Sequence, residues 1–365
     1  MTRDKRSRRS ARSLPVAGGI GAMAVLAGRE LLGRAREADL HGQVALVTGG
    51  TRGLGLALAR ELADQGCRLV ICARDDAELQ AAGEDLERGG AEVLAIHCDV
   101  AVKTDVDRMV AVALEVYGRV DVLICNAGVI QVGDLASMEL TDFQQAMDVM
   151  YWGVLHSVLA VLPGMRERKA GRIGIVTSVG GKISVPHMVP YNAAKFAAVG
   201  LSEGLHAELA GDGITVTTIV PGLIRTGSYL NAWFSGDDAS REAHYRLFTP
   251  ISALPGVVPS ADVAARAFVR AIRRGAVECI YPLPFSIVAR AHGLAPAATT
   301  RVLALVDRLL PKSGGNPEVA TETASGMTID PRITSRTWRW LTTLGERAAE
   351  RFRERPGPVS VPTPD

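Results

Sequence analysis

The chain carries the stretch Val44-Ala45-Leu46-Val47-Thr48-Gly49-Gly50-Thr51-Arg52-Gly53-Leu54-Gly55, in which an apolar run passes through a glycine-rich turn into a helix-length segment. Glycines let a backbone turn tightly and let a ligand come close to the main chain. The free amides and the positive dipole end of a following helix favour phosphate. A glycine cluster alone also fits a plain strand-to-helix turn. At the start of the first strand–helix unit, it predicts a phosphate-binding turn made by Thr48, Gly49, Thr51, Arg52, Gly53, Leu54 and Gly55.

Outward from this turn, short β-branched runs alternate with amphipathic segments of helix length. The expected strands are Val44–Thr48, Arg68–Ala73, Glu92–Cys98, Val120–Cys125, Gly171–Thr177, Thr215–Val220 and Val277–Tyr281. The expected helices are 53–66, 76–88, 103–117, 139–163, 190–211 and 260–274. This alternation predicts an α/β fold with a doubly wound, seven-stranded, mainly parallel sheet and helices on both faces.

The composition agrees with a globular protein that buries a sizeable core. Of 365 residues, 47% are hydrophobic and 22% charged, which excludes disordered, collagen-like and disulfide-scaffold chains. Residues 1–12 hold six basic residues and one acidic residue, so the remainder has a net charge of −3 and is mildly acidic, and no nucleic-acid partner is expected. The five cysteines lack metal-site spacing, which favours buried thiols in a reducing compartment and no metal site.

The end of the second strand bears on the choice of dinucleotide. An NAD-selective fold usually presents a carboxylate there to the ribose 2′-hydroxyl, but this chain has Ala73. Arg74 and Arg52 are suited to pair with a 2′-phosphate, with solvated surface arginines as the alternative. Asp75 and Asp76 add opposing charge nearby. The stretch predicts NADP(H) as the preferred cofactor, with NAD(H) still allowed.

Polar and small residues follow the third and fourth strands, where ligands of open α/β sheets collect. They are Asp99 and Val100, and then Asn126, Ala127 and Gly128. Asp99 is expected to accept from the adenine amino group and Asn126 to hold neighbouring strands in register. Each taken alone is as often an ordinary turn residue.

Tyr191 and Lys195 are spaced i, i+4 on an expected helix, and Ser178 ends the fifth strand. A tyrosine with a pKa near about 10 is a weak acid at neutral pH, but a nearby ammonium favours its phenolate. Lys195 is expected to supply that charge, and Ser178 to donate to a carbonyl oxygen. His156 and His187 lack matched partners and are interpreted as helix packing or pocket lining.

In order and spacing, the turn together with Asn126-Ala127-Gly128, Ser178, Tyr191-x-x-x-Lys195 and Pro221-Gly222 resembles the short-chain dehydrogenase/reductase family over about residues 41–281. The resemblance implies a Rossmann-type fold with Ser178, Tyr191 and Lys195 as catalytic residues. It implies that Lys195 contacts the nicotinamide ribose, that Pro221 and Gly222 belong to the cofactor site, and that Thr226 contacts the carboxamide end. A homodimer or homotetramer is also implied.

The resulting prediction is an oxidoreductase that transfers hydride between NADP(H) and a carbonyl or secondary alcohol. Where this chain has Met150, the family usually has an asparagine. That asparagine lets a water link Lys195 to bulk solvent and so supplies protons. We therefore keep as alternative a catalytically weak or inactive cofactor-binding scaffold or sensor. A lid at about 222–258 contains Trp233, Phe234, Tyr245 and Phe248; these either form local core or contact a lipophilic substrate.

Two extensions flank the domain expected at 41–285. Residues 1–40 are basic and then apolar, and the run Leu14–Gly28, about 22 Å as a helix, falls short of a bilayer. An export signal, a peripheral membrane contact through residues 1–30 and a disordered extension stay open; a cytoplasmic location is preferred. Residues 286–365 are expected to hold a helix at Ile287–Leu310, a linker at about 311–332, and a second helix at Thr337–Arg353 in a solvated tail.

Overall fold

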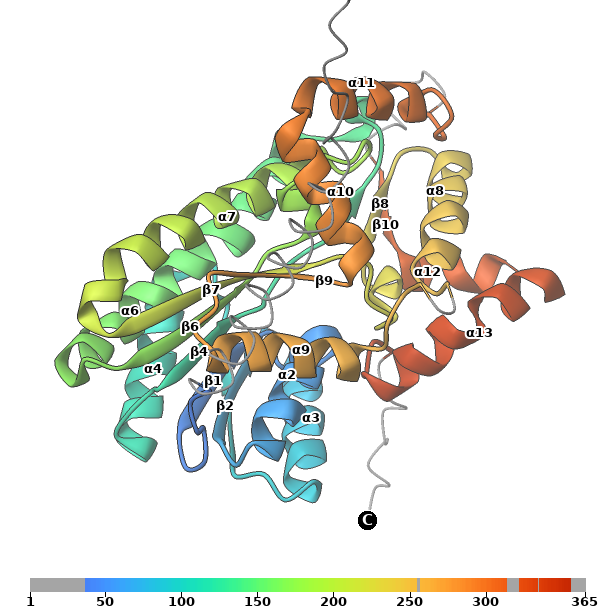
Figure 1. Cartoon of the computed structure of the whole chain (residues 1–365). Helices are drawn as coiled ribbons and strands as arrows, with labels where there is room; N and C mark the ends of the chain where they lie inside the picture. The colour runs from blue at the N-terminus through green and yellow to red at the C-terminus, as the bar shows by residue number, and fades with distance from the viewer. Residues whose placement is uncertain (1–36, 255–256, 314–321, 334, 356–365) are drawn as a thin grey trace, which may run out of the picture. The chain divides into compact units, whose positions relative to one another are not determined.

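The computed structural model describes residues 37–254, 257–313, 322–333 and 335–355 (Figure 1). The expected N-terminal leader and the membrane contact through residues 1–30 lie outside these residues. Asp39 to the C-terminus belongs to one compact unit, which contains every element described below.

The main sheet has seven strands in the order β3-β2-β1-β4-β6-β7-β9, and every neighbouring pair is parallel. Its strands are β1 Val44–Thr48, β2 Arg68–Ala73, β3 Val93–His97, β4 Val122–Cys125, β6 Gly171–Val176, β7 Ile214–Pro221 and β9 Glu278–Tyr281. This confirms the doubly wound fold expected from the alternation. Because strand order reverses between β1 and β4, the carboxyl ends of these strands open a crevice there.

Helices cover both faces of the sheet, with α2, α3 and α9 on one face and α4, α6 and α7 on the other (Figure 1). Their bounds are α2 Gly53–Asp64, α3 Asp76–Arg88, α4 Lys103–Tyr117, α6 Gly153–Arg168, α7 Val189–Leu209 and α9 Ala261–Arg273. Fully buried Leu46, Leu123 and Ile173 lie in the core between the sheet and these helices.

The helix expected at 139–163 is interrupted. It consists of α5 Leu140–Met147, a wider π-helical turn η2 at Asp148–Trp152, and α6. This stretch, Leu140–Arg168, is the one helical segment among the described residues that is long and apolar enough to cross a membrane, and half of its apolar window is buried inside the fold. A core helix passes the same test, so its length and composition do not indicate a membrane span.

The long insertion after β7 folds into structure of its own. A second, three-stranded sheet has the order β10-β8-β5, formed by β5 Gln131–Val132, β8 Trp233–Ser235 and β10 Thr323–Ser325. Helix α8, Asp238–Ile251, follows β8 and packs on it. The expected lid is therefore a small layer with a core that includes Tyr229, Phe234 and Tyr245.

The C-terminal part departs from expectation in two ways. The helix expected at Ile287–Leu310 is two helices, α10 Leu283–Leu294 and α11 Pro296–Asp307, because the non-helical backbone at Ala295 and the proline after it break the run. Further on come α12 Gly326–Ile329, a 3-10 turn at Asp330–Arg332 and α13 Arg336–Arg351.

The prediction that the C-terminal part of the chain is a solvated tail is wrong. Helix α13 packs against α8, and Trp338, Ala349 and Phe352 are buried. A balanced charge count describes the polar face of an amphipathic helix but does not reveal its apolar face, which here closes the core of the lid.

Candidate active site

The glycine turn joins β1 to α2 and is tightly packed. Gly49 and Gly53 adopt positive φ angles of 63° and 57°, which other residues rarely reach. A Cβ on Gly55 would collide with the carbonyl oxygen of Gly49 and with the Asn126 side chain. The turn thus places small residues at the N-terminus of a twelve-residue helix, a position that favours the pyrophosphate of a dinucleotide.

Asn126 connects this turn to the end of β4. Its side-chain amide donates to the carbonyl oxygens of Thr48 and Gly49 at 3.1 and 3.0 Å. The Thr48 hydroxyl accepts from the backbone amides of Asn126 and Ala127 at 3.0 and 3.2 Å. Asn126 therefore holds the neighbouring strands in register, as expected. Thr48 is buried and links the ends of β1 and β4 by these hydrogen bonds, and it does not line the cavity.

A cavity of about 1170 Å³ runs along the carboxyl ends of the strands. All expected site residues except Thr48 line it: Gly49, Thr51, Arg52, Gly53, Leu54, Gly55, Arg74, Asp99, Val100, Asn126, Ala127, Gly128, Ser178, Tyr191, Lys195, Pro221, Gly222 and Thr226. The motifs scattered along the sequence thus converge on one hollow.

The two arginines expected near the ribose differ in what they contact. Arg52 donates to Glu78 at 2.7 Å and lies 3.9 Å from a carboxylate oxygen of Glu354. Arg74 is 56% exposed and has a looser pair with Asp99 at 3.7 Å. Asp75 caps α3 by accepting from the amide of Glu78 at 2.9 Å, so part of its charge is used at that helix terminus.

Ser178, Tyr191 and Lys195 meet where β6 ends and α7 begins. The Ser178 hydroxyl accepts from the Gly180 amide at 3.0 Å and lies close enough to Tyr191 to lower the pKa of its hydroxyl. Lys195 is buried, donates to the carbonyl oxygen of Val176 at 2.9 Å, and places Nζ 5.8 Å from the centre of the Tyr191 ring. Two hydroxyls and one amine therefore face the same part of the cavity.

Burial dominates the proton affinities of these groups. It raises the pKa of Tyr191, and the nearby Ser178 hydroxyl lowers it by less. Burial lowers the pKa of Lys195 to about 8. The expectation that Lys195 lowers the pKa of Tyr191 is wrong for this structure, because the amine is turned to Val176 and faces the ring rather than the hydroxyl.

Met150 and the Lys195 amine both lie against Gly128. A Cβ built on Gly128 would be 3.6 Å from the Met150 sulfur and 3.7 Å from Lys195 Nζ. Met150 is buried in the π-helical turn, so a thioether lies in the neighbourhood of the lysine where an amide was expected from the resemblance. A thioether offers no donor and only a weak acceptor to a proton path.

Of the four lid aromatics, two lie in the local core and two line the cavity. Phe234 and Tyr245 are fully buried in the lid core, and the Tyr245 hydroxyl donates to Asp330 at 2.7 Å. Trp233 and Phe248 line the cavity. Leu247 and Ile251 of α8 and Leu303, Val306 and Leu310 of the α11 region also line it. This end of the cavity is predominantly apolar.

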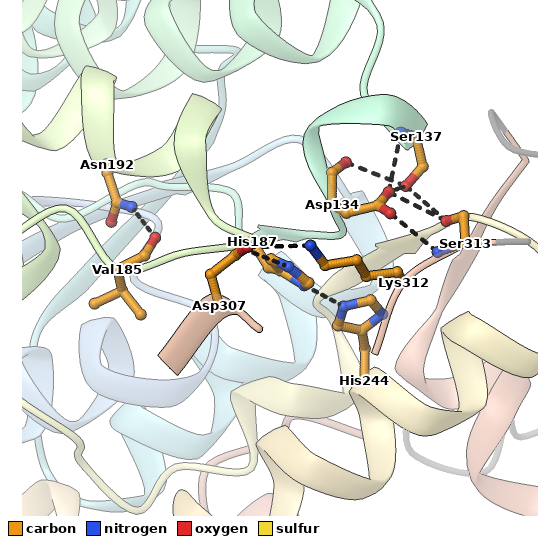
Figure 2. Close-up of polar contacts among 9 residues, drawn as sticks. All are labelled: Asp134, Ser137, Val185, His187, Asn192, His244, Asp307, Lys312 and Ser313. Atoms are coloured by element: carbon orange, nitrogen blue, oxygen red, sulfur yellow. Dashed lines mark hydrogen bonds and ion pairs between the residues drawn. The ribbon is translucent and has the colours of Figure 1, made fainter. Parts of the chain in front are cut away.

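Three polar side chains join the loop before α7 to α8 and α11 across this end (Figure 2). The carbonyl oxygen of Ser240 accepts from His244 Nδ1 at 2.8 Å, which leaves His244 Nε2 to accept from His187 Nδ1 at 2.6 Å. His187 Nε2 then faces Asp307 at 3.2 Å. Burial and the neighbouring His187 lower the pKa of His244. His187 lines the cavity and His156 bonds to the carbonyl oxygen of Val100, as their interpretation predicted.

Two glutamates of the cavity, Glu78 and Glu354, are absent from the sequence-based set. Glu354, almost at the end of the described chain, lines the cavity and is only 4% exposed. The carbonyl oxygen of Phe352 accepts from the Gly53 amide at 2.8 Å. No local pattern signals these contacts, because they join the glycine turn to the other end of the chain.

Comparison with known proteins agrees with this geometry. The sequence pattern described as short chain dehydrogenase matches residues 43–233. A 3-oxoacyl-(acyl-carrier-protein) reductase of Synechocystis is 37% identical over 188 residues, covering 51% of this chain and 76% of that protein. A fold and cavity of this kind define a nucleotide-binding oxidoreductase.

Two solved structures share the fold. A short chain dehydrogenase/reductase of Burkholderia phymatum in complex with NAD has a TM-score of 0.64 and 28% identity, covering 69% of this chain and 93% of that one. An actinorhodin polyketide ketoreductase variant with NADPH has a TM-score of 0.57 and 31% identity, covering 66% and 95%. The chain belongs to the short-chain dehydrogenase/reductase family and acts on CH–OH or C=O groups.

Proposed function

We propose that the protein is an NADP(H)-dependent carbonyl reductase or alcohol dehydrogenase for a lipophilic substrate. The observation that supports this most directly is that Ser178, Tyr191 and Lys195 line the same cavity as the glycine turn. A proton donor and a dinucleotide turn in one hollow are the two requirements of hydride transfer to a carbonyl.

In this proposal, the bound nicotinamide supplies or accepts the hydride. Ser178 orients the substrate oxygen by donating a hydrogen bond to it, which stabilises the negative charge that develops there. Tyr191 gives its hydroxyl proton to that oxygen in reduction and takes it back in oxidation. Lys195, with a pKa of about 8, holds a charge that changes near neutral pH, and we assign to it the contact with the nicotinamide ribose that the family resemblance implies.

The preference for NADP(H) rests on Arg74. It is exposed and only loosely paired, next to Ala73, which offers no carboxylate to a 2′-hydroxyl. Arg52 is less available because Glu78 binds it at 2.7 Å. We therefore assign the 2′-phosphate to Arg74 first, with Arg52 secondary and NAD(H) as the weaker cofactor.

The proposal of a lipophilic substrate is based on the apolar end of the cavity, which is formed by α8 and α11 with Trp233. A ketone carried on a long or polycyclic apolar group suits such a wall. The names of the relatives, a 3-oxoacyl reductase and a polyketide ketoreductase, agree with a carbonyl on an extended carbon chain.

We also propose the division into residues 1–40, the domain 41–285 and the extension 286–365, a cytoplasmic location, and a homodimer or homotetramer. Five free cysteines, four of them buried, suit a reducing compartment. Exposed Leu114, Val116 and Leu159 on α4 and α6 supply apolar surface for a second copy.

Oxidation of NADPH by the purified protein against a panel of hydrophobic ketones tests the function. We expect turnover with NADPH, slower turnover with NADH, and loss of both in Tyr191→Phe. Binding of cofactor without turnover across the panel, unchanged by that substitution, favours the alternative of an inactive scaffold or sensor.

A further inference from the structure

The segment Phe352–Glu354 is a fixed part of the cofactor cavity. The Phe352 carbonyl oxygen accepts from the Gly53 amide at 2.8 Å, and its ring is buried beneath the guanidinium of Arg60, 5.9 Å from the ring centre. Just before it, Arg351 pairs with Asp262 of α9 at 2.5 Å. These contacts hold the segment against both α2 and α9.

The Glu354 carboxyl group is held at the N-terminus of α2. Asn231 donates its side-chain amide to the carbonyl oxygen of Glu354 at 2.8 Å and to its carboxylate at 2.7 Å. A Cβ on Gly53 would collide with this carboxyl group, and Thr226 lies close enough to it to lower its pKa. The chain's own anion therefore lies beside the turn that fits a pyrophosphate.

Two anions at one helix terminus repel each other unless a cation separates them. The charges that face Glu354 are Arg52 at 3.9 Å, which is shared with Glu78, and Glu78 itself. The neighbouring Arg355 pairs with Asp330 at 3.0 Å, and thus points its charge elsewhere. Burial raises the pKa of Glu354 to about 7, so its charge changes at physiological pH.

We propose that Glu354 couples cofactor binding to proton uptake: the dinucleotide binds the protein when the Glu354 carboxyl group is neutral, with the segment Phe352–Glu354 remaining in place. The neutral group keeps its hydrogen bond from Asn231 and presents no charge to the pyrophosphate. Cofactor affinity is then highest in mildly acidic solution and falls as Glu354 ionises. This inference rests on the proposed position of the pyrophosphate at the glycine turn, but not on the preference for NADPH.

Isothermal titration of the full-length protein with NADPH tests it, in two buffers of different ionisation enthalpy. At pH 8 we expect an uptake of about 0.9 proton per NADPH, and at pH 6 an uptake of about 0.1. The dissociation constant rises about fivefold from pH 7 to pH 8. Glu354→Gln removes both effects, whereas Glu350→Gln, an exposed glutamate on α13, leaves them unchanged.

The outcomes separate this proposal from the proposed function. Tight binding of NADPH without proton uptake contradicts the role of Glu354. This measurement uses the unsubstituted protein alone, so it does not depend on whether a variant folds. The same pH slope in folded Glu354→Gln also contradicts it, since Lys195 would then be its source. Failure to bind either NADPH or NADH at any pH contradicts the proposed function itself, and this proposal with it.

Discussion

The two sides of the cavity are built from the chain in different ways. The reactive side, Ser178, Tyr191 and Lys195, comes from β6 and α7, which are close in sequence and covered by the main core. The tail side, Phe352 and Glu354, reaches the glycine turn from the opposite end of the chain. Neighbouring elements thus bring Ser178, Tyr191 and Lys195 together, whereas a long-range contact joins the tail side to the glycine turn.

Changes on the reactive side should therefore alter turnover, and changes on the tail side should alter binding and stability. The largest expected effect is on the reactive side. Tyr191→Phe removes the transferable proton but keeps the ring, so kcat should fall by about 10²- to 10⁴-fold. Cofactor affinity, measured by fluorescence titration, should stay within about twofold. A comparable loss of affinity would mean that Tyr191 mainly binds the cofactor.

The second effect belongs to the tail side and needs no cofactor. The pKa of Glu354 is about 7 in the folded protein and ordinarily 4.5. Because the folded value is raised, its stabilising contribution is complete below pH 4.5 and is lost as pH rises through about 7. Urea unfolding should show up to about 3 kcal/mol less stability at pH 8 than at pH 5 from this group.

Glu354→Gln is the matched variant for that measurement. It should flatten the part of the pH dependence that lies between 4.5 and 7, and Glu350→Gln should not. If the unsubstituted protein and Glu354→Gln show the same dependence of stability on pH, ionisation of Glu354 does not destabilise the fold.

A smaller effect distinguishes the two arginines near the ribose. Arg74→Ala should raise the KM for NADPH by about 10- to 100-fold, because a charge-assisted contact to phosphate is lost. The KM for NADH should change little. Arg52→Ala provides the comparison and should have the weaker effect, since Glu78 and Glu354 already engage Arg52. The reverse order would move the 2′-phosphate to Arg52.

The smallest expected effect tests proton supply on the reactive side. Met150→Asn places an amide near Lys195 and should raise kcat by about twofold to fivefold, with a reduced solvent isotope effect. Thermal unfolding serves as control, because a polar group is introduced at a buried site. Unchanged turnover in a folded variant contradicts the view that Met150 slows proton transfer.

The sequence predicts the first side of this comparison much better than the second. The seven strands and their flanking helices follow from alternation, since each run is a local pattern of apolar side chains. The π-helical turn at Asp148–Trp152 has no such signal, and the continuous pattern around it predicts one helix. The short strands β5, β8 and β10 are too brief to show a period and form only by pairing across the chain.

The site follows the same division. Spacing and order bring together the glycine turn and the residues of the reactive side, which line one cavity. Glu354 and Phe352 escape notice because their partners, Gly53 and Asn231, are distant in sequence. The direction of the Tyr191 pKa is also missed, since it depends on burial and on where Lys195 points, which spacing does not give.

Helix α11 has a further consequence for the evolution of this protein. Its Leu303 and Val306 line the apolar end of the cavity, yet the helix has no buried residue. Its side chains can therefore be exchanged with little cost to folding, because substitutions at exposed positions rarely destabilise a protein. New substrates become accessible by altering this one helix while the chemistry beneath it is inherited intact.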